Sequence, residues 1–212
     1  MRYHAALSAA ISVIAIVEAN PSADQNLSIR SALPEGYNVE PMAWTGIIER
    51  GGPELSFSGT ADEITQQIQA VKKDFTWENL RRDLGVSSVP PQKRDGKNGI
   101  ICGVGGEDVA SHGALTSNMK DTMKKIAGMI GTCAVAAGPR VCSVIACTRN
   151  AAVWLCNDNA GPIAPPCNSL ASYVEDIISA CGLTYYHGHQ FTRGQEFDTG
   201  NFNVVVGWDS HC

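Results

Sequence analysis

The residues best suited to chemistry in this chain are its eight cysteines, and all of them lie in its second half. They are Cys102, Cys133, Cys142, Cys147, Cys156, Cys167, Cys181 and Cys212. No CxxC pair occurs, and the spacings lack the paired short steps that zinc ligands favour. The cysteines therefore predict four disulfide bonds rather than a metal site, and we expect neither a metal ion nor another cofactor.

The spacing of the cysteines excludes some disulfides and leaves most pairings open. Cys167 and Cys181 lie fourteen residues apart in a predicted helix, and the helical rise would separate them by about 21 Å. A disulfide requires Cα atoms within about 7 Å, so these two cannot bond to each other. Cys142 and Cys147 cannot pair if they share one continuous strand. Cys147 and Cys156 flank a predicted hairpin and could pair across it.

A second set of side chains could supply hydrolytic chemistry. A small secreted ribonuclease needs a general base, a general acid and a cation for the phosphate. These types of group are present in His187, His189, Glu196, Arg193 and His211. The sequence contains neither HExxH nor GxSxG, and nothing in it fixes the relative positions of these residues. We therefore expect a protein that is not an enzyme, with no catalytic residues and no metal ligands.

Two stretches are rich in asparagine and aspartate, residues 154–159 and residues 194–203. Their side-chain oxygens could bind calcium. Asn and Asp also hydrogen-bond to nearby backbone in turns and at helix ends. We expect the second role, in which these residues cap turns and helices.

The N-terminus predicts export from the cell. Arg2 precedes an apolar run over residues 5–17, and small residues stand at the −3 and −1 positions of a cut after Ala19. This is the pattern of a signal peptide. The run is shorter than the roughly 20 residues of a membrane span, so we expect a secreted, extracellular protein without one. Asn26 begins an N-glycosylation sequon.

A dibasic pair, Lys93–Arg94, marks the point where the cysteines begin. It lies within residues 89–99, a Pro-, Gly- and charge-rich stretch that predicts an exposed linker. Kex2-type proteases of the fungal secretory route cut after such pairs. Other dibasic pairs, among them Lys72–Lys73 and Arg81–Arg82, occur in stretches with helical patterning, where a protease has less access. We therefore predict processing after Arg94, and the alternative is an interdomain linker that stays uncut.

Processing would divide the chain into a signal peptide over 1–19, a pro-segment over 20–94 and a mature cysteine-rich domain over 95–212. Within the pro-segment, strands are expected over residues 42–49 and 54–58. A helix should follow, with Thr60 and Glu63 forming a capping box at its start. This small ββα unit would either chaperone the folding of the mature domain or mask its surface.

The mature part alternates predicted strands and helices. Strands are expected over residues 99–104, 140–146, 151–156 and 200–206, and helices over 114–131 and 167–182. A turn at residues 148–150 joins the second and third strands, and a short extra strand is expected near Gln190–Phe191. The order β-α-β-β-α-β predicts an α+β fold, a small disulfide-stapled α/β sandwich with two helices on one face of an antiparallel sheet.

The same residues resemble a known family. The segments that carry the resemblance are GIIC at 99–102, VCSVIAC with AAVWLC over 141–156, CNSLASYVEDIISAC over 167–181, and GQEFDTGNFNVVV over 194–206. In cysteine placement and strand–helix order, residues 95–212 are similar to fungal secreted proteins related to the smut-type killer toxins. The resemblance implies a compact α/β sandwich held by disulfides. It also implies action outside the cell, as a killer toxin, a virulence effector or a host-interaction factor.

Taken together, the sequence predicts a non-enzymatic secreted effector or toxin-like protein whose exposed loops act on a host or competitor cell. The alternatives are a small secreted hydrolase such as a ribonuclease, and a structural protein of the cell wall. A net charge of −5 gives no reason to expect nucleic-acid binding. The expected partners are a Kex2-type processing protease and an extracellular or host-cell target whose identity the sequence leaves open, as it does the oligomeric state.

Overall fold

The computed structural model describes residues 32–34, 36–86, 96–103, 112–182 and 184–212. Four of the predicted sites, Ala19, Asn26, Lys93 and Arg94, lie outside these ranges. The signal peptide, the sequon and the dibasic cut therefore stay predictions. Within the described ranges, every helix is too short or too polar to span a bilayer.

The described part of the chain forms helices and strands in mixed order. Its helices are α1 (Ala61–Val71), α2 (Trp77–Leu84), α4 (Thr116–Gly128) and α5 (Cys167–Cys181). Its strands in the first half are β1 (Asn38–Val39), β2 (Ala43–Gly46) and β3 (Leu55–Ser58). Those of the second half are β4 (Lys97–Cys102), β5 (Ala114–Leu115), β6 (Thr132–Ala134), β7 (Val141–Thr148), β8 (Ala151–Asn157), β9 (Thr184–Tyr186), β10 (His189–Thr192), β11 (Gly194–Asp198) and β12 (Phe202–Trp208).

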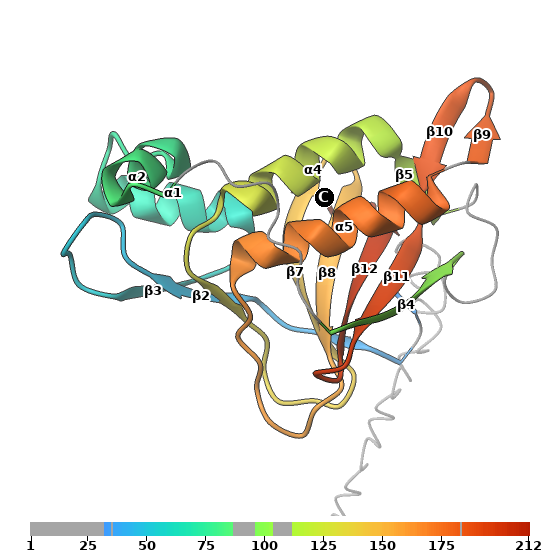
Figure 1. Cartoon of the computed structure of the whole chain (residues 1–212), viewed down its shortest axis with the longest axis horizontal. Helices are drawn as coiled ribbons and strands as arrows, with labels where there is room; N and C mark the ends of the chain where they lie inside the picture. Colours follow the sequence, from blue (N-terminus) through green and yellow to red (C-terminus); the bar gives the residue numbers. More distant parts are fainter. Residues whose placement is uncertain (1–31, 35, 87–95, 104–111, 183) are drawn as a thin grey trace, which may run out of the picture.

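Six of these strands form the main sheet, in the order β1-β7-β8-β12-β11-β4. Neighbouring strands in it are antiparallel, except that the short edge strand β1 runs parallel to β7. Helices α4 and α5 lie across one face of this sheet, and α1 and α2 lie at one end of the molecule (Figure 1). The predicted α+β fold, with two helices on one face of a disulfide-stapled antiparallel sheet, is confirmed.

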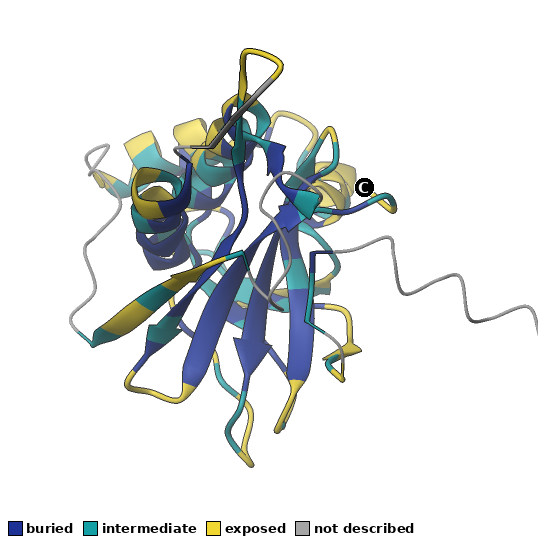
Figure 2. Cartoon of the chain, turned by 90° about the vertical axis from the view of Figure 1, so that its right-hand side faces the viewer, coloured by how far each residue is buried: buried dark blue, intermediate teal, exposed yellow. Residues whose placement is uncertain are grey.

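The central strands β8 and β12 are buried along almost their whole length, because both faces of the sheet are covered (Figure 2). Val204 and Val206 of β12 pack into the large core beneath the helices. Val205, on the opposite face, joins a second cluster with Trp154 and Ala32. Burial on both faces explains why β12 carries three consecutive apolar residues, Val204, Val205 and Val206, rather than an alternation of polar and apolar residues.

The predicted hairpin over β7 and β8 is present and turns at Arg149–Asn150. Both residues have positive φ, 47° and 66°. Two central residues with positive φ give a turn whose twist matches that of the flanking strands. The turn aligns Ala146 with Val153, and a β-bulge at Ile145 then shifts the register by one residue, which places Cys142 directly opposite Cys156.

The predicted helices form, with small shifts at their ends. Thr60 and Glu63 make the expected capping box at the start of α1. The helix expected from residue 114 begins at Thr116, because Ala114–Leu115 pairs with β10 instead. Helix α2 was not predicted as a separate element, although Thr76 caps its start and Gly85 adopts a left-handed conformation at its end.

All eight cysteines form disulfides: Cys102–Cys181, Cys133–Cys167, Cys142–Cys156 and Cys147–Cys212. The disulfide bonding predicted for these residues is therefore present. The pairing of Cys147 with Cys156 across the hairpin is wrong, because the register brings Cys142 opposite Cys156. Cys167 and Cys181, at the two ends of α5, bond to different partners, as the helical spacing requires. Helix α5 is thereby fixed to its neighbours at both ends.

One buried hydroxyl inside this core gives a stability prediction. Ser143 of β7 is fully buried opposite Leu155, and its Oγ has no hydrogen-bond partner in the described part of the chain. Burying an unpaired hydroxyl costs about 1–3 kcal/mol. We therefore expect Ser143→Ala to raise the free energy of unfolding by about 1 kcal/mol, measured by urea denaturation.

The matched control is Thr122→Val on α4. Thr122 is also fully buried, but its hydroxyl donates to the carbonyl oxygen of Ala151 at 3.0 Å. Losing that bond should lower the free energy of unfolding by about 1 kcal/mol. Equal losses in Ser143→Ala and Thr122→Val would contradict the prediction.

Candidate functional site

The most unusual polar group in the described core is the carboxylate of Glu196 on β11, only 3% exposed. Side chains alternate along a strand, so Gly194, Glu196 and Asp198 share one face. A Cβ built on Gly194 would lie 2.7 Å from Ile177 of α5, which identifies this face as the one under the helix. Two acidic side chains are therefore buried between the sheet and α5.

Lys97, at the start of edge strand β4, is the cation of this site. Its Nζ lies 2.6 Å from Asp176 Oδ2, 3.5 Å from Glu196 Oε2 and 2.9 Å from the Ser172 carbonyl oxygen. The ammonium also stands 4.5 Å from the ring centroid of Tyr173, a cation–π contact. The side chain of Lys97 is only 11% exposed, so little water screens these interactions.

Asp198, the second buried carboxylate, is satisfied by hydrogen bonds rather than by an ion pair. The hydroxyl of Tyr173 donates to its Oδ2. The backbone N–H of Gly200 donates to its Oδ1 at 2.6 Å. Tyr173 thus contributes twice to the site, with its ring beneath Lys97 and its hydroxyl on Asp198.

The surroundings of Glu196 move its pKa toward neutrality. Burial raises its pKa from the ordinary value of 4.5 to about 7. The charge of Lys97 lowers this pKa, while the negative charges of Asp176 and Asp198 raise it. Lys97 Nζ, 3.5 Å from Glu196 Oε2, lies at the long limit of a hydrogen bond, and no other described residue donates to this oxygen.

This cluster of Lys97, Tyr173, Asp176, Glu196 and Asp198 can hold or release a proton near pH 7. A carboxyl group with such a pKa is the kind that general acid–base catalysis uses. A catalytic role also requires contact with a substrate, and the 3% exposure of Glu196 leaves no room for that contact. In this conformation the geometry therefore defines an internal ion pair that responds to pH.

The ribonuclease set of the sequence analysis is not brought together. Glu196 faces α5, whereas Arg193 lies near the Ala32 carbonyl oxygen, in a segment that packs on the other face of the sheet. His187 and His189 are exposed on the β9–β10 hairpin. His211 lies beyond β12, with its Nδ1 3.1 Å from Asp209 Oδ1. No group of metal-binding side chains occurs among the described residues.

The asparagine-rich loop after β8 caps a turn, as expected. The amide nitrogen of Asn157 donates to the carbonyl oxygens of Ala136 and Gly161, both at 2.8 Å. Its Oδ1 accepts the backbone N–H of Asn159 at 2.9 Å. The second stretch, also predicted to cap turns and helices, contains β11 and the first two residues of β12, and the side chain of Asp198 caps the turn between them by accepting the Gly200 N–H.

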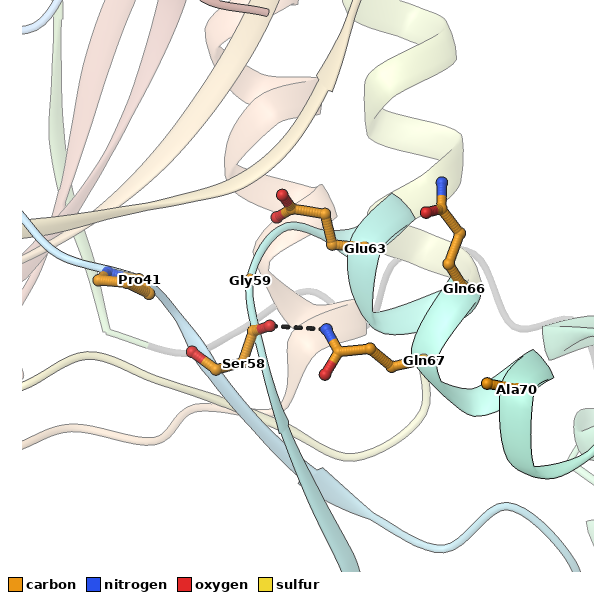
Figure 3. Close-up of a pocket in the computed structure, with 7 residues that line it drawn as sticks. All are labelled: Pro41, Ser58, Gly59, Glu63, Gln66, Gln67 and Ala70. Carbon is orange, nitrogen blue, oxygen red and sulfur yellow. Dashed lines mark hydrogen bonds between the residues drawn. The ribbon is translucent and has the colours of Figure 1, made fainter.

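A pocket of about 620 Å³ lies elsewhere, between the start of β2, the end of β3 and helix α1 (Figure 3). Three of its polar side chains, those of Ser58, Glu63 and Gln67, hydrogen-bond within the protein. Gln67 donates to the Ser58 carbonyl oxygen at 2.8 Å, the dashed line in Figure 3. Glu63 accepts the backbone N–H of Thr60 at 2.7 Å as part of the capping box. The sequence analysis did not predict this pocket.

Comparison of the chain with protein-family models, with curated proteins and with solved structures gave no match.

Proposed function

We propose that this chain is the precursor of a secreted, proteolytically processed, cysteine-rich fungal effector or killer-toxin-like protein. It acts without catalysis on a host or competitor cell. The observation that supports this most is the set of four disulfides within residues 102–212. Several disulfides in a small domain are typical of extracellular proteins, because they form and persist in oxidising compartments.

The β9–β10 hairpin is the proposed working surface. Figure 1 draws it projecting beyond the ends of α4 and α5. Its turn residues, from His187 to His189, are exposed. His187 and Gly188 both have positive φ, 47° and 80°, so the turn is compact. A shaped loop on a disulfide-braced scaffold is a common way to present a binding surface.

The processing part of this proposal is tested by the intact mass of the secreted protein. The expected product has lost residues 1–19, is cut after Arg94 and has lost eight thiol hydrogens. Retention of the signal peptide or free thiols in the product would contradict secretion through an oxidising route.

The biological part is tested on cells. Purified secreted protein, cut and uncut, is added to candidate host and competitor cells, with a reduced and alkylated sample as the control. Growth arrest or a defence response that requires the intact disulfides is expected. The absence of any response across the panel, together with RNA hydrolysis by the same sample, would instead support the hydrolase alternative.

The working surface itself gives a further prediction. Replacing both His187 and His189 by serine should reduce the cell response at least tenfold, because the turn is the proposed contact surface. The control is His211→Ser, since the side chain of His211 is 63% exposed on a different segment. Equal activity in both variants would show that the hairpin is not the contact surface.

A further inference from the structure

The described part of the cysteine-free segment, residues 32–34 and 36–86, is built into the same core as the described residues of the second half. Strand β2 lies between β3 of its own segment and β6 of the other. The pairing aligns Trp44 with Cys133, whose disulfide partner Cys167 begins α5. The segment is thus joined by backbone hydrogen bonds to the disulfide-braced half.

Trp44 is the anchor of this contact. It is fully buried, and its Nε1 donates to the Ile130 carbonyl oxygen at 2.8 Å. Gly131 lies so close that a Cβ there would be 2.5 Å from the Thr45 carbonyl oxygen. The backbone after α4 therefore packs directly against β2, with no space for a side chain at Gly131.

A second contact lies on the main sheet, at its β7 edge and on the face opposite α4 and α5. β1 adds to β7, with Asn38 N–H donating to the Arg140 carbonyl oxygen at 2.9 Å. Ala32 N–H donates to the Trp208 carbonyl oxygen at 2.8 Å. Ala32 also joins the apolar cluster that covers this face of the sheet.

Polar contacts at the rim complete the interface. Lys125 of α4 pairs with Asp62 of α1 at 2.7 Å. The guanidinium of Arg81 donates to the Gly128 carbonyl oxygen at 3.0 Å, at the end of α4. Every cysteine of the chain lies at or after Cys102, so no disulfide can join the two segments.

We propose that residues 32–86 stay bound after processing, as the second chain of a non-covalent heterodimer with residues 96–212. This rests on the processing that is part of the proposed function. Hydrolysis adds one water across the Arg94–Asp95 peptide bond, leaving a carboxylate on Arg94 and an amine on Asp95. The bond broken lies outside the described contacts, so the buried interface persists. The segment predicted as a removable pro-segment is then a permanent subunit.

The test begins with the purified full-length secreted protein and a Kex2-type protease. After complete digestion, a non-reducing denaturing gel should show two fragments. Size exclusion at low micromolar concentration and native mass spectrometry should show one species of the summed mass. Two separate peaks from fully cut protein would overturn the proposal.

Failure of the protease to cut would count against the predicted processing, not against the interface. A variant in which residues 90–94 are replaced by the recognition sequence of a site-specific protease then repeats the same measurement. Co-elution of its fragments supports the interface, and their separation overturns it.

Trp44→Ala should weaken the complex about 100-fold or more, because truncating a buried tryptophan removes a large contact. Val71→Ala is the matched control in the same segment, since Val71 is 66% exposed and its loss should leave the complex intact.

If uncut Trp44→Ala fails to fold by circular dichroism, Asp62→Lys replaces it. This change sets two like charges together and should weaken the complex several-fold, most strongly at low salt. Unchanged association in the folded variants would contradict the proposed interface.

Discussion

Replacing Lys97 by methionine should lower the free energy of unfolding by about 3–5 kcal/mol near pH 8. Methionine keeps much of the length of the side chain but removes the ammonium that lies between Asp176 and Glu196. Breaking a buried ion pair is costly because the remaining charge stays desolvated. The loss should shrink near pH 4, where Glu196 takes up a proton and needs no cation.

The control for this variant is Lys124→Met on α4. The side chain of Lys124 is 73% exposed and its pair with Asp121 is 3.4 Å long. Exposed pairs contribute about 1 kcal/mol at most, so this variant should change stability little at any pH. Urea unfolding of both variants near pH 4 and pH 8 makes the comparison. A loss in Lys97→Met that does not depend on pH would contradict the ion-pair account.

Glu196 should make the stability of the protein depend on pH in a specific direction. Its pKa rises from 4.5 to about 7 on folding, so the folded state holds the proton more tightly than the unfolded state. The resulting stabilisation is fully present below about pH 4.5 and is lost as the pH rises through about 7. Over that window the loss is on the order of 3 kcal/mol.

Comparison with Glu196→Gln isolates this contribution, because glutamine does not titrate. The free energy of unfolding of the variant minus that of the natural protein should increase by on the order of 3 kcal/mol from about pH 4 to about pH 8. Carbon-13 NMR of the Glu196 carboxyl provides an independent reading of its pKa. If the free energy of unfolding changes with pH in the same way in both proteins, Glu196 is excluded as the titrating group.

The elements that the sequence predicted well are those set by local signals. The hairpin of β7 and β8 follows from two apolar runs around Arg149–Asn150, and α1 from its capping box at Thr60. The disulfide pairs were left open because they depend on strand register. A shift of one residue would place Cys142 opposite a different neighbour.

Strand β11 was missed because its sequence, Gly-Gln-Glu-Phe-Asp, is rich in residues that disfavour strands. It forms because β12 and β4 pair with it on both sides and α5 covers it. Its polar side chains find partners far away in the chain. Glu196 meets Lys97, and Asp198 meets Tyr173.

The ion cluster could be predicted only in part, for the same reason. Glu196 and Asp198 share a face by strand alternation, and Tyr173 and Asp176 share a face by helical spacing. Their meeting at Lys97 depends on how α5 packs on the sheet, and the disulfides at both ends of α5 fix that packing. No short-range signal contains this information.

The two-residue strand β1 has a consequence for solubility. It covers part of the edge of β7, an eight-residue strand at the border of the main sheet, by pairing with Val141 and Cys142. An open edge of that length is a template for strand addition between copies, and thus for fibrous aggregation. Retaining β1 therefore shortens the open edge of the main sheet. A fragment stripped of residues 32–86 should precipitate where the intact protein stays in solution.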